Sequence, residues 1–192
     1  MKKLKFLCIN LLVVFLLTAC AEKEESSKEI ELTPNTIETG KSDENDQKIF
    51  GEFTSQTLEG DNVTEAVFGE SDLTMVNIWG TFCGPCIQEM PGLGNLAREY
   101  EDKGVQIIGI ISDVTEPGNE TALEIIDATN VEYMNLVTSE YLYVNALQYI
   151  SAVPMTAFVD KEGNMVGEIY AGSRTEEDWK SIIEELLKEV QR

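Results

Sequence analysis

A β-prone run that leads into a Cys-x-x-Cys sequence constrains the fold of this chain more than any other feature. The run Leu73–Trp79 is apolar, and Cys83-Gly84-Pro85-Cys86 follows it after three residues. The residues after this sequence predict a helix, which places both cysteines at its start. Unpaired N–H groups and a partial positive charge at a helix N-terminus stabilise a thiolate, the reactive form of cysteine. The pattern therefore predicts a redox site at a strand-to-helix junction.

Strands and helices alternate through the rest of the chain. The β-branched run Val105–Ile111 predicts a strand that is buried on both faces, as in a parallel sheet. A turn at 161–164 between two short strands predicts an antiparallel hairpin, and Thr175 with Asp178 predicts a capping box. The order indicates an α/β fold with a central mixed sheet and helices on both faces. Further strands are expected at 53–57, 62–63, 134–137, 155–159 and 165–170, and helices at Gly84–Tyr100, 119–130, 140–147 and from Thr175 onward.

The first 48 residues differ from the rest. A basic start and a short apolar run predict a secretory signal peptide over residues 1–19. Leu17-Thr18-Ala19-Cys20 resembles a bacterial lipobox, which implies lipidation of Cys20; an ordinary signal peptide that ends near a cysteine is the alternative. Residues 20–48 are polar and charged, and such a composition predicts a flexible tether. Residues 49–192 then form one domain of ordinary size.

Charge and composition exclude several kinds of function. The formal net charge is −21, which argues against nucleic acid as a partner. The chain has no histidine, so a His-dependent triad and the commonest metal ligand are absent. Two cysteines do not complete a four-ligand zinc site, and no metal or cofactor is expected. From the residues alone, a structural disulfide or a partial metal site remains the alternative to a redox pair.

Several segments together resemble the thioredoxin superfamily, and within it the membrane-anchored TlpA/ResA-like thiol-disulfide oxidoreductases. The resemblance covers about residues 50–190 and implies a thioredoxin-like fold. The segment from Asp113 to Asn145 resembles the central insertion of this subgroup. The matching motifs are the stretch 76–91 around the cysteines, Val153-Pro154-Met155-Thr156, which is similar to the cis-proline segment, and the hairpin 160–164.

The resemblance implies roles for individual residues. Cys83 is expected to be the exposed nucleophile, and Cys86 the buried resolving thiol. A cis peptide bond is expected between Val153 and Pro154, where the alternative is a proline that merely begins a strand. Glu89, one helical turn after Cys86, is implied as its proton acceptor, and this would need a pKa raised by burial. The alternative is a solvated helix glutamate.

Two positions depart from the common pattern. Asn77 stands where many thioredoxins have aspartate, so a buried acid is not available there. Phe82 stands where many relatives have tryptophan.

The implied function is the reduction of disulfides in exported proteins at the outer face of the bacterial membrane. The Gly84-Pro85 pair between the cysteines resembles thioredoxin, a reductant. The resemblance suggests a CcdA-type membrane electron donor, and apocytochrome c or a methionine sulfoxide reductase as clients.

Three alternatives remain open. The first is an oxidase or isomerase on the same fold. The second is a thiol peroxidase, although Thr81 lies only two residues before Cys83 rather than in a Thr-x-x-Cys pattern. The third is a non-catalytic binding lipoprotein whose cysteines act as a staple.

Overall fold

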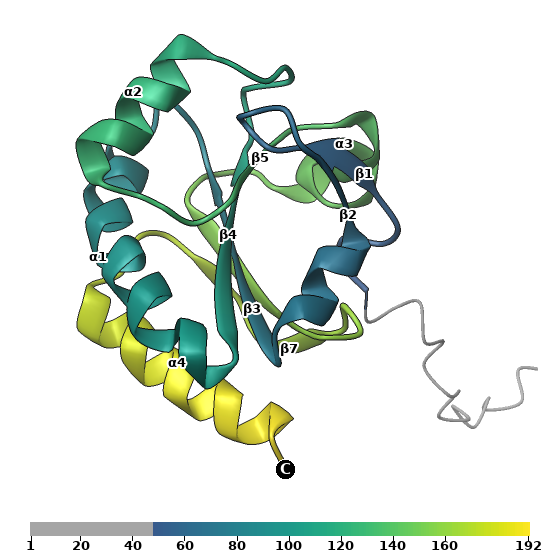
Figure 1. Cartoon of the computed structure of the whole chain (residues 1–192), viewed down its shortest axis with the longest axis vertical. Helices are drawn as coiled ribbons and strands as arrows, with labels where there is room; N and C mark the ends of the chain where they lie inside the picture. Colours follow the sequence, from purple (N-terminus) through teal and green to yellow (C-terminus); the bar gives the residue numbers. More distant parts are fainter. Residues whose placement is uncertain (1–47) are drawn as a thin grey trace, which may run out of the picture. The chain divides into compact units, whose positions relative to one another are not determined.

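A five-stranded mixed sheet forms the centre of the computed structural model, which describes residues 48–192 (Figure 1). The strand order is β5-β4-β3-β6-β7. Strands β3, β4 and β5 are parallel to one another, whereas β6 runs antiparallel to β3 and β7 antiparallel to β6. The expected mixed sheet is confirmed. The strands are β3 (Leu73–Trp79), β4 (Val105–Ile111), β5 (Asn135–Val137), β6 (Met155–Asp160) and β7 (Met165–Ala171).

Helices cover both faces of this sheet, as expected. In Figure 1, α1, α2 and α4 lie on its left and α3 lies on its right. Side chains of Asn119, Ser139 and Thr175 cap the starts of α2, α3 and α4, and the capping box of Thr175 with Asp178 is present. The helices are α1 (Gly84–Tyr100), α2 (Glu120–Thr129), α3 (Glu140–Asn145) and α4 (Glu176–Val190), with short 3-10 turns η3 (Glu101–Lys103) and η4 (Leu147–Tyr149).

The helix expected over 140–147 is shorter than predicted. It ends at Asn145, and Ala146 leaves the helical conformation before the chain turns into η4. Leu142 and Leu147 are both buried. The break in the helix lets both leucines reach the core.

The N-terminal part of the domain forms a small hairpin of β1 (Thr54–Gln56) and β2 (Asn62–Thr64), followed by a 3-10 helix η2 (Glu65–Glu70). The two strands agree with expectation, but η2 was not predicted. Its N-cap hydrogen bond runs from Ala66 N to Thr64 Oγ1, and it buries Val67 and Phe68. Burial of these two side chains favours the turn over the irregular loop that the sequence suggests.

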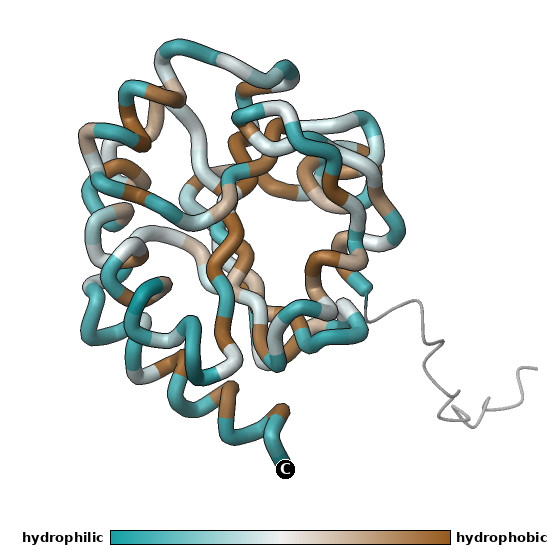
Figure 2. Tube along the Cα trace, in the orientation of Figure 1, coloured by the Kyte–Doolittle hydropathy of each residue, from teal (hydrophilic) through white to brown (hydrophobic). Residues whose placement is uncertain are grey.

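Apolar side chains fill the two faces of the sheet separately. Figure 2 shows the hydrophobic residues concentrated along the central strands. Because side chains alternate along a strand, each central strand contributes to both layers. Toward α1 and α4 the core contains Leu73, Met75, Leu93, Leu96, Phe158, Trp179, Ile183 and Leu186; toward η2 and α3 it contains Phe50, Phe53, Phe68, Val76, Ile78, Ile108, Ile110, Leu142 and Leu147.

A close contact at the middle of β4 requires glycine. A Cβ atom on Gly109 would lie 2.0 Å from Asn135 Oδ1 and 3.0 Å from Trp79 Nε1. Those two atoms form a buried hydrogen bond of 2.9 Å. Gly109 therefore allows this bond to cross the strand, and the bond fixes the end of β3 against β5.

The segment between β4 and β6, for which the resemblance predicts the central insertion, contains α2, β5 and α3. The predicted signal peptide (1–19), the lipidation site Cys20 and all but the last residue of the predicted tether (20–48) lie outside the described residues. Within residues 48–192, none of the helices has both the length and the apolar character needed to cross a membrane.

Candidate active site

The Cys83–Cys86 pair forms a disulfide at the start of α1, with Cα atoms 5.3 Å apart. Cys83 is the N-cap of the helix, and its Sγ accepts a hydrogen bond of 3.2 Å from Cys86 N. Pro85 lies in the first turn, where its missing N–H costs no helical hydrogen bond. In the reduced protein the same N–H and the helix N-terminus stabilise a thiolate on Cys83.

The two cysteines differ in accessibility, but less than the sequence suggested. Cys83 is 5% exposed and Cys86 is 0% exposed. The expected order is correct, whereas the description of Cys83 as exposed is wrong for the disulfide form. Cys83 belongs to a buried apolar cluster that also contains Trp79, Met90 and Val137. The adjacent Phe82 is 73% exposed.

The cis-proline segment lies beside this cluster. The peptide bond between Val153 and Pro154 is cis, as expected. Val153 packs against the cluster that contains both cysteines. The carbonyl of Pro154 accepts a hydrogen bond of 2.9 Å from Gly172 N, which joins this segment to the loop before α4.

Glu89 is buried rather than solvated. Its Oε1 accepts a hydrogen bond of 3.1 Å from Asn77 Nδ2. Its Oε2 accepts bonds of 3.0 Å from the backbone N–H of Arg174 and 3.2 Å from Trp179 Nε1. Burial raises the pKa of Glu89 above its ordinary value, although these three hydrogen bonds and the charge of Arg174 oppose that effect. Among the hydrogen bonds of residues 48–192, none joins Glu89 directly to Cys86.

Asn77 connects Glu89 to the strand that follows the cis-proline. Asn77 lies on β3 opposite Thr156 on β6, and its Nδ2 also donates to Thr156 Oγ1 at 3.1 Å. Its Oδ1 is buried without a partner in the described part of the chain. The acid that many thioredoxins carry on this strand is absent, and Glu89 on α1 supplies a buried carboxyl beside the same position.

Arg174 and Trp179 were not identified from the sequence as site residues. The Arg174 guanidinium lies 5.0 Å from the ring centroids of both Tyr170 and Trp179. It donates to the carbonyls of Ala171 and Gly172, and so fixes the loop that contacts Pro154. No local pattern marks these residues, because both lie more than 80 positions from Glu89.

A carboxylate holds the loop before Cys83. Asp113 accepts bonds of 3.0 Å from Thr81 N and 2.5 Å from Thr81 Oγ1. Asp113 lies two residues after the end of β4, which pairs with the end of β3. Nothing in the sequence marks this contact except that both residues follow parallel strands.

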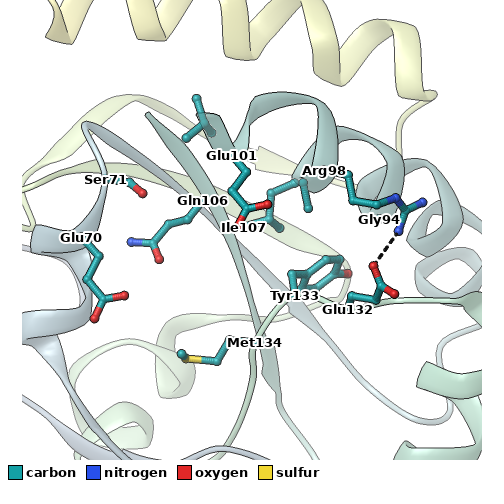
Figure 3. Close-up of a pocket in the computed structure, with 12 residues that line it drawn as sticks. Glu70, Ser71, Gly94, Arg98, Glu101, Gln106, Ile107, Glu132, Tyr133 and Met134 are labelled. Atoms are coloured by element: carbon teal, nitrogen blue, oxygen red, sulfur yellow. Dashed lines mark hydrogen bonds and ion pairs between the residues drawn. The ribbon is translucent and has the colours of Figure 1, made fainter. Parts of the chain in front are cut away.

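A cavity of about 540 Å³ lies beside α1 and β4 (Figure 3). The end of η2 and residues 132–134 complete its lining, and an ion pair of 3.5 Å between Arg98 and Glu132 borders it. Neither cysteine lines it. Across residues 48–192, no group of three or more His, Cys, Asp or Glu side chains is placed to hold a metal ion.

A redox-active disulfide at a helix N-terminus, with a cis-proline beside it on this mixed sheet, defines a thiol-disulfide oxidoreductase with a thioredoxin-like fold. The family model described as Redoxin matches residues 45–187, and the chain belongs to that family. Within the thioredoxin superfamily it is TlpA/ResA-like.

Known proteins similar to this chain agree with that assignment. Thiol-disulfide oxidoreductase ResA of Halalkalibacterium halodurans is 29% identical over 136 residues, which cover 71% of this chain and 72% of the relative. ResA of Bacillus thuringiensis subsp. konkukian is 28% identical over 138 residues, or 72% and 74% of the two chains. The crystal structure of a thioredoxin family thiol:disulfide interchange protein from Chlorobium tepidum TLS superposes with a TM-score of 0.59 at 20% identity, covering 71% and 93%.

Proposed function

We propose that the protein reduces disulfides of exported client proteins at the outer face of a bacterial membrane, to which a lipid on Cys20 anchors it. The Cys83 N-cap geometry is the observation that carries this proposal, because it favours a thiolate on one cysteine of the pair. The names of the ResA relatives support thiol-disulfide chemistry. The predicted signal peptide and lipobox support the location.

The proposed reaction begins with the reduced pair. The Cys83 thiolate attacks one sulfur of a client disulfide, a mixed disulfide forms, and the other client sulfur leaves as a thiolate that takes up a proton. Cys86 then loses its proton and attacks Cys83 Sγ. This step releases the second client thiolate and forms the Cys83–Cys86 disulfide. Two electrons pass from the pair to the client.

Glu89 is the proposed proton acceptor for Cys86. It lies one turn along α1 from Cys86 and is buried, and its pKa is raised by that burial. Within residues 48–192 no direct hydrogen bond joins the two groups, so the proposed transfer passes through a bridging water. A carboxyl with a raised pKa takes a proton from a thiol more readily than an ordinary carboxylate does.

Return of the pair to its reduced form requires an external dithiol. A CcdA-type membrane carrier is the proposed donor, and apocytochrome c or an extracytoplasmic methionine sulfoxide reductase are the proposed clients. Both assignments follow from the resemblance to TlpA/ResA-like proteins.

The equilibrium reduction potential of the pair, measured on a fragment that begins near Lys48, tests the direction of electron flow. A value below about −240 mV supports a reductase, and a value above about −150 mV identifies an oxidant and contradicts the proposal. Trapping adds a second test. Cys86→Ser is expected to retain client proteins as mixed disulfides, whereas Cys83→Ser serves as the matched control and is expected to retain none.

A further inference from the structure

Exposed apolar side chains gather on the segment between β5 and β6. Tyr141, Tyr143 and Val144 of α3 and Tyr149 of η4 are between 50% and 77% exposed. We refer to these four residues as the aromatic face. Leu142 and Leu147 of the same segment are buried and hold it on the sheet.

The geometry of α3 places three of these residues outward together. Successive residues of a helix are separated by about 100°, so Leu142 faces the core and Val144 faces the opposite side. Tyr141 and Tyr143 lie on the two flanks. The solvent-facing half of α3 is therefore mostly apolar. Single exposed apolar residues are normal on a protein surface, but a group within nine positions indicates a contact surface.

The aromatic face belongs to a segment that begins and ends at the active-site edge of the sheet. It leaves β5 after Val137, which pairs with Ile111 at the end of β4. Ile111 in turn pairs with Trp79, the last residue of β3 before the cysteine loop. The segment re-enters the sheet at Met155, which pairs with Ile78. The second end lies beside β3, which carries the cysteine loop, whereas β4 separates the first end from β3.

The second end of the segment lies beside the apolar cluster of the redox site. Val153 packs against the cluster that contains Cys83 and Cys86. Tyr149, the most exposed of the four residues, lies only four positions before Val153. The aromatic face is therefore joined along the chain to the cis-proline segment beside the redox site.

We infer that the aromatic face binds the extended, apolar polypeptide that flanks a client disulfide while Cys83 attacks that disulfide. This inference rests on the proposed function and names the class of client. Tyrosine suits such a surface, because it offers a large apolar area and a hydroxyl at low cost in conformational entropy. The strongly negative charge of the chain favours client segments that are neutral or basic over acidic ones.

Substitution of two tyrosines tests the inference with two substrates. Insulin serves as a polypeptide whose apolar chains are joined by disulfides, and oxidised glutathione serves as a small disulfide. The double variant Tyr141→Ser/Tyr149→Ser is expected to lower kcat/KM for insulin roughly five- to tenfold. Its kcat/KM for oxidised glutathione is expected to stay within about twofold of the unsubstituted protein, because the tripeptide is too small to reach α3.

Met165→Ser provides the matched control. Met165 is 38% exposed at the start of β7 and pairs with Val159, at the end of β6 away from Pro154, so the substitution removes exposed apolar area remote from the site. It is expected to leave both reactions unchanged. Thermal unfolding of all variants verifies that the fold is retained.

Three results would overturn the inference. The first is an unchanged insulin reaction in the double variant. The second is an equal loss with both substrates, since this would mean that the tyrosines support the cysteines and not the client. The third is a loss of binding to neutral phosphatidylcholine vesicles with normal insulin reduction, which would assign the aromatic face to lipid. If the unsubstituted protein reduces neither substrate, the proposed function itself fails.

Discussion

The carboxylate of Glu89 and the side-chain amide of Asn77 form a buried hydrogen bond of 3.1 Å between α1 and the central strand β3. The same amide nitrogen bonds Thr156, whereas the amide oxygen of Asn77 has no partner among the described residues. If Glu89 takes up a proton, rotation of the amide by half a turn lets the new O–H donate to that oxygen. The pair can therefore satisfy either protonation state of the carboxyl.

Glu89→Gln is expected to remove a pH dependence of stability. The pKa of Glu89 is raised in the folded protein, so between the unfolded value of about 4.3 and the folded value the folded state binds more protons. The free energy of unfolding contributed by this group therefore falls as the pH rises through that window. Urea unfolding of the oxidised domain at closely spaced pH values should show this fall in the unsubstituted protein and a flatter curve in the variant.

Glu99→Gln is the matched control for that measurement. Glu99 is an exposed glutamate on the same helix, and its pKa is lowered by its hydrogen bond to Lys180. Its contribution to stability is present above the unfolded pKa and is lost as the pH falls, so it has the opposite sign, and it is small because the pair is exposed. Equal curves for both variants would contradict the assignment of the effect to Glu89.

Asn77→Asp is expected to destabilise the protein at neutral pH. The change places a second carboxyl within hydrogen-bond distance of Glu89 in a buried position, where two negative charges cannot both persist. We expect a loss of about 2–3 kcal/mol at neutral pH, and a smaller loss in acid, where the pair shares a proton. Asn77→Ala removes the donor without adding charge, so its loss should depend less on pH. Chemical denaturation at pH values on either side of the window measures both variants.

Trp179→Phe removes one donor to Glu89 and keeps most of the ring. Because the acceptor is charged, the loss should reach about 1.5–3 kcal/mol at a pH at which Glu89 is ionised. It should shrink when Glu89 is protonated, and the pKa of Glu89 should rise further. Tyr170→Phe preserves the edge contact with Trp179 and serves as the control for aromatic packing. A loss for Trp179→Phe that is independent of pH would show that packing alone is responsible.

The parts of the fold that were predicted correctly depend on local sequence. The strand at Leu73–Trp79, the helix at Gly84–Tyr100 and the strand at Val105–Ile111 have the expected bounds, because proline, glycine and apolar runs mark them along the chain. The cysteine pair and the cis bond before Pro154 follow from equally compact motifs.

What was missed depends on contacts between distant segments. The bond from Trp179 to Glu89 spans 90 positions, and the bond from Arg174 spans 85. Neither a tryptophan at position 179 nor an arginine at position 174 implies a hydrogen bond to Glu89. A polar Asn77 within an otherwise apolar strand was a visible sign of a buried hydrogen bond, yet it did not identify the partner. The low exposure of Cys83 likewise results from packing of the start of α1 against side chains of the strands.

Asp113→Asn is expected to make Cys83 more acidic. The Asp113 carboxylate accepts two bonds from Thr81, two residues before Cys83, and so places a negative charge near the nucleophile. A negative charge disfavours a neighbouring thiolate, and asparagine keeps one acceptor oxygen while removing the charge. The pKa of Cys83 in the reduced protein should therefore fall, and the effect should be small because the Asp113 carboxylate is exposed and screened by salt. Thiolate absorbance in the ultraviolet measures this titration.

Asp102→Asn makes the same change of charge in η3, beyond the far end of α1, and should leave the Cys83 titration unchanged. An equal shift in the two variants would mean that only net charge acts, whereas a shift confined to Asp113→Asn that disappears in high salt would identify Asp113 as the local charge that sets the reactivity of Cys83.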